Sequence, residues 1–155
     1  MSTNQSIRRS VLWAAYGDAL GFITEMCNES SLLHRTRGKS RITGLIPWVR
    51  KIGGEFGIYV ELPTGCYSDD TQLRLATSRS IRGDGSFDVE TFSKIEIPVW
   101  LSYALGAGLG TKTAAQSLKK SQIQWNSNFF KSKYAQYIEG GGNGAAMRIQ
   151  PQLSI

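Results

Sequence analysis

Residues 68–79 read SDDTQLRLATSR, in which four oxygen-bearing side chains stand directly before an apolar pattern with helical spacing. The pattern predicts a helix that begins near Ser68 and ends before Gly83. A serine hydroxyl at the start of a helix accepts a hydrogen bond from a free N–H group, and acidic side chains in the first turn complement the helix dipole. Capping alone therefore explains Ser68, Asp69 and Asp70.

The same side chains also suit a divalent cation. Mg²⁺ prefers hard oxygen ligands, takes few of them from the protein and keeps several waters. Consecutive helical residues diverge by about 100°, so Asp69 and Asp70 would either hold two metal ions or bind one ion while orienting a water. The residues leave the capping and the metal-binding interpretations both open.

The rest of the chain has a mainly helical pattern. Further helices are expected from Ser6 to about Leu20 or Gly21, from just after Gly85 to Gly106 with a kink or restart at Pro98, from Thr111 or Thr113 to Leu118, and from Ala145 onward. The helix that begins just after Gly85 is expected to contribute Phe92, Ile95, Trp100 and Tyr103 to the hydrophobic core. Residues 28–63 are expected to form a long loop with a short β-like run at 58–60. These elements predict one mainly α-helical domain over residues 1–155.

Composition excludes several classes of protein. A chain of 155 residues with 41% hydrophobic residues is long and apolar enough to bury a core, which excludes disorder for most of it. Two cysteines, Cys27 and Cys66, and one histidine, His34, cannot build a disulfide scaffold or a cysteine zinc site, and they leave little for a Ser-His-Asp triad. A reducing, cytoplasmic location is expected. No stretch approaches the ~20 apolar residues of a membrane span, so no membrane partner is expected.

The net charge of +6 is partly local. Residues 34–41 contain four basic side chains: Arg35, Arg37, Lys39 and Arg41. This segment is either a solvated loop or a contact for an anion, such as nucleic acid or a phosphorylated ligand. Its Gly-Lys-Ser run resembles the end of a P-loop, but that motif needs glycine where this chain has Leu33. A P-loop is therefore excluded.

A second pair of acidic residues lies near the N-terminus, in GDALG at 17–21 and at Glu25. Asp18 and Glu25 are seven residues apart, so on a continuous helix they share a face at a separation of ~10 Å. That exceeds the ~5 Å between the two carboxyl groups of a retaining glycosidase. A carboxylate within an apolar helical stripe needs a partner, which backbone N–H groups near a helix end would also provide.

Residues 140–148 read GGGNGAAMR. Successive glycines permit a nest of backbone N–H groups before a helix start, which suits a phosphate. The run also matches a loose dinucleotide-binding pattern, but no buried strand precedes it and no acidic residue follows it at the required distance. That pattern is excluded, and a phosphate-binding loop and a plain flexible turn remain.

Taken in order, these three segments resemble the ADP-ribosylglycohydrolase family of the dinitrogenase-reductase-activating glycohydrolase type. GDALG with Glu25 is similar to the family's first helix. SDDT at 68–71 is similar to its first metal motif, usually Thr-Asp-Asp-Thr, with Ser68 keeping the hydroxyl. GNGAAMR at 142–148, followed by Pro151, is similar to its ligand-binding loop.

The resemblance implies an all-α, compact multi-helix fold and hydrolysis of the bond that joins ADP-ribose to an acceptor. It also implies two Mg²⁺ ions, for which Ser68, Asp69 and Asp70 would be ligands. Asp69 and Asp70 would supply negative charge to an oxocarbenium-like transition state, and Glu25 would lie beside the metals as the candidate proton donor. The residues implied to hold the ribose and diphosphate are Gly140, Gly141, Gly142, Asn143 and Gly144.

The family's second metal motif, of the Asp-x-Asp-Thr type, is absent after Thr71. The chain is therefore expected to be the N-terminal half of such an enzyme, with half of the metal ligands, and to end at 152–155 where a helix would continue. The alternatives are a non-enzymatic module that binds ADP-ribose or a nucleotide, and a nucleic-acid-binding protein that uses residues 35–41. The acceptor is left open among protein, nucleic acid and small molecule.

Overall fold

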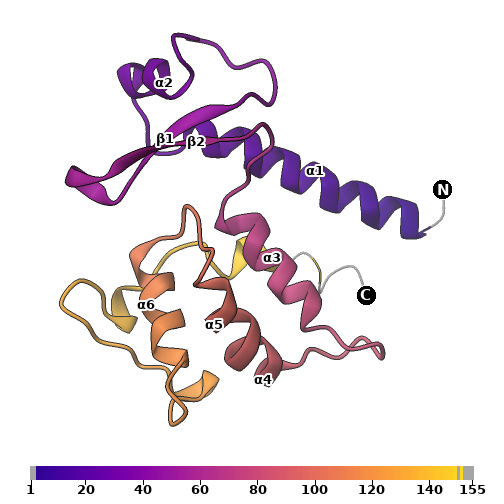
Figure 1. The fold of residues 1–155 in the computed structure, drawn as a ribbon. Coiled ribbons are helices and arrows are strands. Elements are labelled where there is room, and N and C mark those ends of the chain that lie inside the picture. Colours follow the sequence, from indigo (N-terminus) through magenta and orange to yellow (C-terminus); the bar gives the residue numbers. More distant parts are fainter. Residues whose placement is uncertain (1–2, 150, 152–155) are drawn as a thin grey trace. The chain divides into compact units, whose positions relative to one another are not determined.

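The computed structural model describes residues 3–149 and 151. The chain forms two compact units, Met1–Tyr67 and Ser68–Ile155, each of which is described by itself (Figure 1). Most of the elements along the chain are helices, and β1 (Trp48–Ile52) and β2 (Ile58–Leu62) form one small two-stranded sheet. The predicted helical fold is thus confirmed. Within the described residues, no helix is both long enough and apolar enough to cross a membrane.

The first unit begins with α1 (Thr3–Thr24), which extends beyond its predicted bounds at both ends. Ser6 therefore lies inside the helix, and the helix start predicted at this residue is wrong. The elements that follow are α2 (Glu29–Arg35), β1 (Trp48–Ile52), a 3₁₀ turn (Gly54–Phe56) and β2 (Ile58–Leu62). The predicted β-like run at 58–60 lies in β2.

The long loop predicted for residues 28–63 is wrong. Asn28 caps α2, since its side chain accepts a 2.9 Å hydrogen bond from the N–H of Ser31. β1 and β2 form an antiparallel hairpin, in which a Cβ on Gly57 would clash with the carbonyl oxygen of Ile52 in β1. Trp48 is buried edge-to-face against Phe22 of α1, with 5.1 Å between the ring centroids. This contact between distant residues stabilises a hairpin that the local pattern did not reveal.

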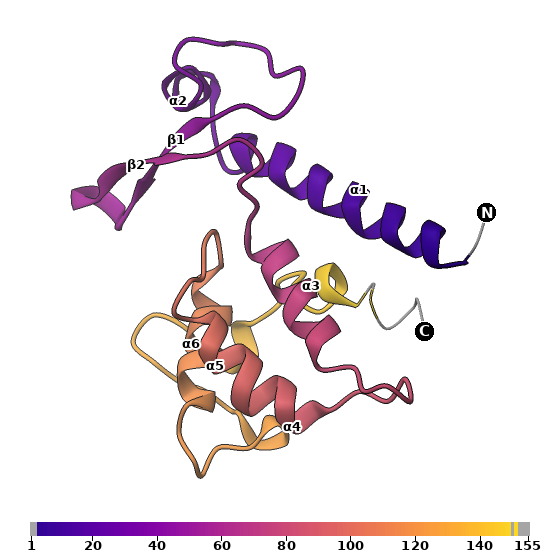
Figure 2. The ribbon, with the colours of Figure 1, turned by 45° about the vertical axis from the view of Figure 1, so that its right-hand side comes forward.

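The second unit begins with α3 (Asp69–Arg79), which starts and ends where the sequence predicts. The elements that follow are α4 (Val89–Thr91), a π-helical turn (Phe92–Glu96), α5 (Ile97–Trp100), α6 (Leu109–Leu118) and three 3₁₀ turns (Trp125–Ser127, Tyr137–Glu139 and Ala146–Arg148). α5 packs between α3 and α6 (Figure 2). The buried core of this unit consists of Leu73, Ile97, Trp100, Ala107, Ala115 and Leu118.

Pro98 restarts the helix as predicted, because the π-helical turn directly precedes α5 and the proline occupies its first turn. Trp100 is fully buried, whereas Ile95 and Tyr103, also predicted in the core, are exposed. Ile95 lies in the π-helical turn and Tyr103 follows the end of α5, so one uniform helical period does not describe either position.

The predicted start of α6 is also wrong. Gly108 occupies the cap position, and Thr113 lies within the helix, where its hydroxyl donates a 2.9 Å hydrogen bond to the carbonyl of Leu109. The helix expected from Ala145 is a single 3₁₀ turn. The helix continuation expected at 152–155 lies outside the described residues.

Candidate functional site

The start of α3 combines capping geometry with a buried acidic group. Ser68 is the cap residue, and its Oγ accepts a 3.2 Å hydrogen bond from the N–H of Asp70. Ser68, Asp69 and Thr71 are all buried, and Asp69 is only 9% exposed. The capping interpretation is thus confirmed. A carboxylate at this depth also needs compensation by hydrogen bonds or a cation.

The donor atoms at the start of α3 suit Mg²⁺. Ser68, Asp69 and Asp70 offer one hydroxyl and two carboxylates, all of them hard oxygen donors, on consecutive residues. Mg²⁺ is commonly bound through one or two carboxylates, with waters as its remaining ligands. The part of the chain that the structure describes contains no cluster of three or more His, Cys, Asp or Glu side chains around a metal position. The set fits part of a magnesium centre.

α3 is tied to the turn that follows the glycine loop. Arg74 lies one helical turn after Asp70, and its Nη2 donates a 3.1 Å hydrogen bond to the carbonyl of Met147. The Nε and Nη1 atoms of Arg74 are buried and have no hydrogen-bond partner among the described residues. The acidic motif and the glycine loop therefore belong to one packed arrangement within the second unit.

The glycine loop lines a cavity of about 470 Å³. Gly140, Gly142 and Gly144 line this cavity, together with the first turn of α6 and Arg148, whereas Gly141 and Asn143 do not. The loop itself is ordered by a 3.1 Å hydrogen bond from the N–H of Met147 to the carbonyl of Asn143. Backbone groups from two segments about 30 residues apart thus border the same space.

Backbone conformation does not require glycine in this loop, since none of its glycines, Gly140, Gly141, Gly142 and Gly144, has a positive φ. A Cβ on Gly142 would meet no atom within 4 Å and would project into open space at the cavity. A Cβ on Gly140 would lie 3.1 Å from the carbonyl oxygen of Tyr137. Of these two positions, only Gly140 is sterically restricted by the protein itself.

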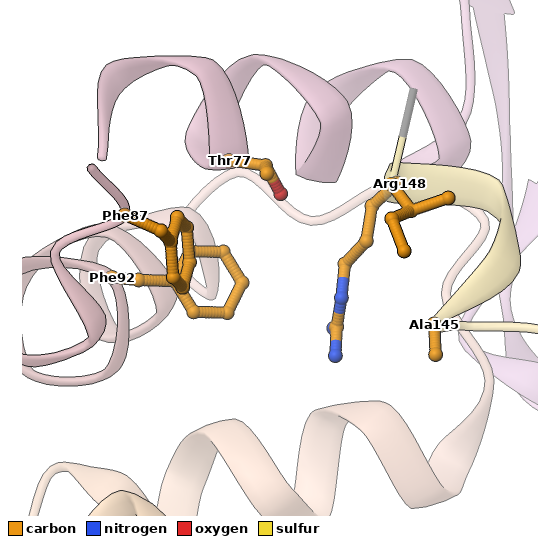
Figure 3. Close-up of a pocket in the computed structure, with 6 residues that line it drawn as sticks. Thr77, Phe87, Phe92, Ala145 and Arg148 are labelled. Carbon is orange, nitrogen blue, oxygen red and sulfur yellow. The ribbon is translucent and has the colours of Figure 1, made fainter. Parts of the chain in front are cut away.

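Arg148 is a cavity residue that the sequence did not single out. Its guanidinium carbon lies 5.3 Å from the ring centroid of Phe92, and burial lowers the pKa of the guanidinium. Arg148 also lines an adjoining cavity of about 200 Å³ with Thr77, Phe87 and Ala145 (Figure 3). Among the described residues it forms no hydrogen bond or ion pair. Its place at the end of GNGAAMR was the signal available in the sequence.

Glu25 belongs to the first unit, one residue beyond α1. Its carboxylate lies 3.7 Å from Nη1 of Arg50, and its carbonyl accepts a 2.8 Å hydrogen bond from Arg35. Burial and then the charge of Asp18 raise the pKa of the Cys66 thiol, while the charge of Arg50 lowers it. Asp18 and Glu25 thus belong to the same unit, in which Arg50 is the cation that pairs with Glu25.

Two members of the basic segment have structural roles. Arg35 donates hydrogen bonds of 2.9 and 2.8 Å to the carbonyls of Ile23 and Glu25, at the C-terminal end of α1. Arg37 is paired with Glu61. Cys27 and Cys66 are both free thiols.

A family model described as ADP-ribosylglycohydrolase matches residues 1–153. The chain belongs to the ADP-ribosylglycohydrolase family. Its three motifs, at 17–25, 68–71 and 140–148, all lie within the matched range. The resemblance stated from those motifs is thereby confirmed.

A curated relative from Rhodospirillum rubrum is named ADP-ribosyl-[dinitrogen reductase] glycohydrolase. It is 29% identical to this ADP-ribosylglycohydrolase family member over 142 residues, which cover 90% of this chain. The chain spans about two fifths of that relative, since the match covers 41% of its length. No solved structure matches the chain.

Proposed function

We propose that this chain takes part in the Mg²⁺-dependent hydrolysis of the glycosidic bond that joins ADP-ribose to a modified protein. The observation that carries the proposal is the 470 Å³ cavity, which the glycine loop, the first turn of α6 and Arg148 line together. Family membership supplies the reaction class, and this cavity supplies a place for the ligand.

The diphosphate of ADP-ribose is the part of the ligand that this cavity suits best. Gly142 and Gly144 line the cavity with no side chain to block an approaching anion, and their backbone N–H groups donate no hydrogen bond among the described residues. The N–H of Gly140 instead donates a 3.1 Å hydrogen bond to the carbonyl of Tyr137. Arg148 adds a cation that remains protonated at neutral pH despite its burial. The volume falls within the usual range of small-molecule pockets, about 300–1,000 Å³.

Ser68, Asp69 and Asp70 are proposed to hold Mg²⁺, as part of the ligand set of a two-ion centre. When bound, the metal would position ribose hydroxyls and activate a water. The carboxylates of Asp69 and Asp70 provide the negative charge that an oxocarbenium-like transition state needs. Their location at the start of α3 keeps them fixed by the hydrogen bond between the N–H of Asp70 and Ser68.

Glu25 is proposed as the acid that protonates the leaving atom of the acceptor. Its backbone is fixed by Arg35 and its carboxylate is oriented by Arg50. A modified protein is the proposed acceptor, because the name of the bacterial relative specifies ADP-ribosyl-dinitrogen reductase. The two free cysteines suit a reducing compartment, and the cytoplasm is the proposed location.

A binding measurement on matched glycine variants tests this proposal. Gly142→Val should abolish ADP-ribose binding in isothermal titration calorimetry, because its side chain enters the cavity. Gly141→Val is the control, since that position also has open space and no positive φ but does not line the cavity. Equal binding by both variants would contradict the proposed ligand site.

The second candidate function is an ADP-ribose-binding module without hydrolysis. The observation that favours it is the metal motif itself, which offers two carboxylates and one hydroxyl in the described chain. Release of free ADP-ribose from an ADP-ribosylated peptide, measured with and without Mg²⁺, separates the two functions. Binding that depends on Gly142, with no release under either condition, would establish the module.

A further inference from the structure

The second unit carries a groove of about 710 Å³ between α6 and residues 129–134. It lies beside the glycine-loop cavity, with which it shares Phe130. Neither the proposed reaction nor the three family motifs use this surface.

Large apolar side chains of the groove are exposed to solvent. Leu109 is 54% exposed, Phe129 67% and Tyr134 72%. Aliphatic side chains of Leu101 and Ile123 line the same groove. Single exposed apolar residues are common on protein surfaces. A contiguous apolar surface rimmed by polar residues is instead typical of a protein interaction site.

The charged side chains of the groove are all lysines. Lys112, Lys120 and Lys131 line it, and no acidic residue does. Among the described residues, none of the three ammonium groups forms a hydrogen bond or an ion pair. The whole of residues 97–138 contains five lysines and no Asp or Glu, so the positive charge has no local compensation.

We propose that this groove binds an acidic protein segment that carries aromatic or aliphatic side chains. Charge complementarity selects the acidic partner. The aliphatic lining selects a peptide over a nucleic acid, because a nucleic acid has no apolar side chains to bury against Leu101, Leu109 and Ile123. The inference does not depend on whether the chain hydrolyses ADP-ribose.

Three polymers test the groove on the full 155-residue chain. The probes are a random glutamate–tyrosine copolymer, polyglutamate of similar length, and an oligothymidylate, each followed by fluorescence anisotropy. The copolymer should bind at least ~10-fold more tightly than polyglutamate, because only it offers aromatic side chains to the apolar lining. Phe129→Ala should reduce this preference.

A pair of triple variants separates the groove from net charge. Lys112→Glu with Lys120→Glu and Lys131→Glu should weaken copolymer binding at least ~10-fold, beyond the loss expected from long-range charge alone. The control combines Arg8→Glu, Lys39→Glu and Arg41→Glu, which changes the net charge equally at exposed positions of the first unit. It should weaken binding less than ~3-fold.

Three outcomes would overturn the proposal. The first is an equal loss of binding in both triple variants, which would mean that net charge alone governs association. The second is tighter binding of oligothymidylate than of the copolymer, which would assign the groove to nucleic acid. The third is no binding of the copolymer by the wild-type chain. Circular dichroism of each variant must match the wild type for these comparisons to count.

Discussion

The guanidinium of Arg74 donates a 3.1 Å hydrogen bond to the backbone carbonyl of Met147 across 73 residues of sequence. Arg74 lies one turn after Asp70 on α3, and Met147 lies in the turn that follows the glycine loop. One side chain therefore couples the acidic motif to the proposed ligand loop. Its other buried nitrogens, Nε and Nη1, have no hydrogen-bond partner among the described residues, so this arrangement is not optimised for stability alone.

Arg74→Leu should weaken ADP-ribose binding at least ~3-fold while changing the free energy of unfolding by only about 1 kcal/mol. The small stability effect is expected because the variant loses one hydrogen bond but also removes two buried donors without partners. Arg79→Leu is the control on the same helix, since Arg79 pairs with Glu96 instead. Calorimetry gives the affinity and urea unfolding gives the stability. Unchanged affinity in Arg74→Leu would show that the tether does not position the loop.

Asp69→Asn and Asp70→Asn should each reduce the affinity for Mg²⁺ at least ~10-fold, because an amide is a weaker ligand than a carboxylate for a hard cation. Asparagine remains compatible with the first turn of α3, so the unfolding free energy should fall by no more than about 1 kcal/mol. Calorimetric titration with magnesium chloride measures the affinity for Mg²⁺. Asp84→Asn, at an exposed turn, is the matched control. Equal Mg²⁺ affinity in all three variants would leave only the capping role.

Gln72→Leu should destabilise the second unit by about 2–4 kcal/mol, because it leaves the buried indole N–H of Trp100 and the half-buried N–H of Leu105 without an acceptor. Oε1 of Gln72 accepts hydrogen bonds of 2.9 Å from Nε1 of Trp100 and 3.2 Å from the N–H of Leu105. Urea unfolding monitored by tryptophan fluorescence measures the loss. Gln116→Leu, at an exposed position of α6, should change stability by less than about 0.5 kcal/mol. A similar small effect at Gln72 would mean that water replaces its hydrogen bonds.

Asp88 should make stability depend on acid pH. The N–H of Thr91 and then the side chain of Arg82 lower the pKa of the Asp88 carboxyl from 3.8 to about 2. Between those values the unfolded chain binds the proton and the folded chain does not, so stability falls as the pH falls from about 4 to 2. Asp88→Asn keeps a capping side chain and should lack this part of the pH dependence. Urea unfolding midpoints of the wild type and Asp88→Asn, measured between about pH 4 and 2, test this prediction. An equal fall of the midpoint in both proteins would contradict it.

Local sequence signals were sufficient to predict structure where a helix cap or a single proline determines it. The run SDDT predicted the start of α3 because a hydroxyl cap acts within three residues of its own position. Pro98 predicted the restart of the helix at α5 because its ring removes an N–H donor. The same kind of signal misled at Thr111 and Thr113, which are good caps but lie inside α6, where Gly108 precedes them.

Elements stabilised by distant contacts were missed. α2 and the β1–β2 hairpin are short, and the hairpin is stabilised by the packing of Trp48 on Phe22 of α1, a contact between residues far apart in sequence. Ile95 and Tyr103 were assigned to the core from their apolar character, although the π-helical turn changes the period of that segment. Periodicity read along a chain assumes one uniform helix, which this segment is not.

The sequence alone determined the family motifs, their order and the capped start of α3, because each depends on residues that are neighbours in the chain. Tertiary structure alone decided which of these residues share a cavity. It brought Gly108, the cap of α6, and Thr111 of its first turn to the same cavity as Gly142 and Arg148, and left Gly141 off the lining. The reason is physical: a cavity is the space left when separate elements pack, and its shape depends on core contacts such as Trp100 with Gln72, which no local pattern specifies.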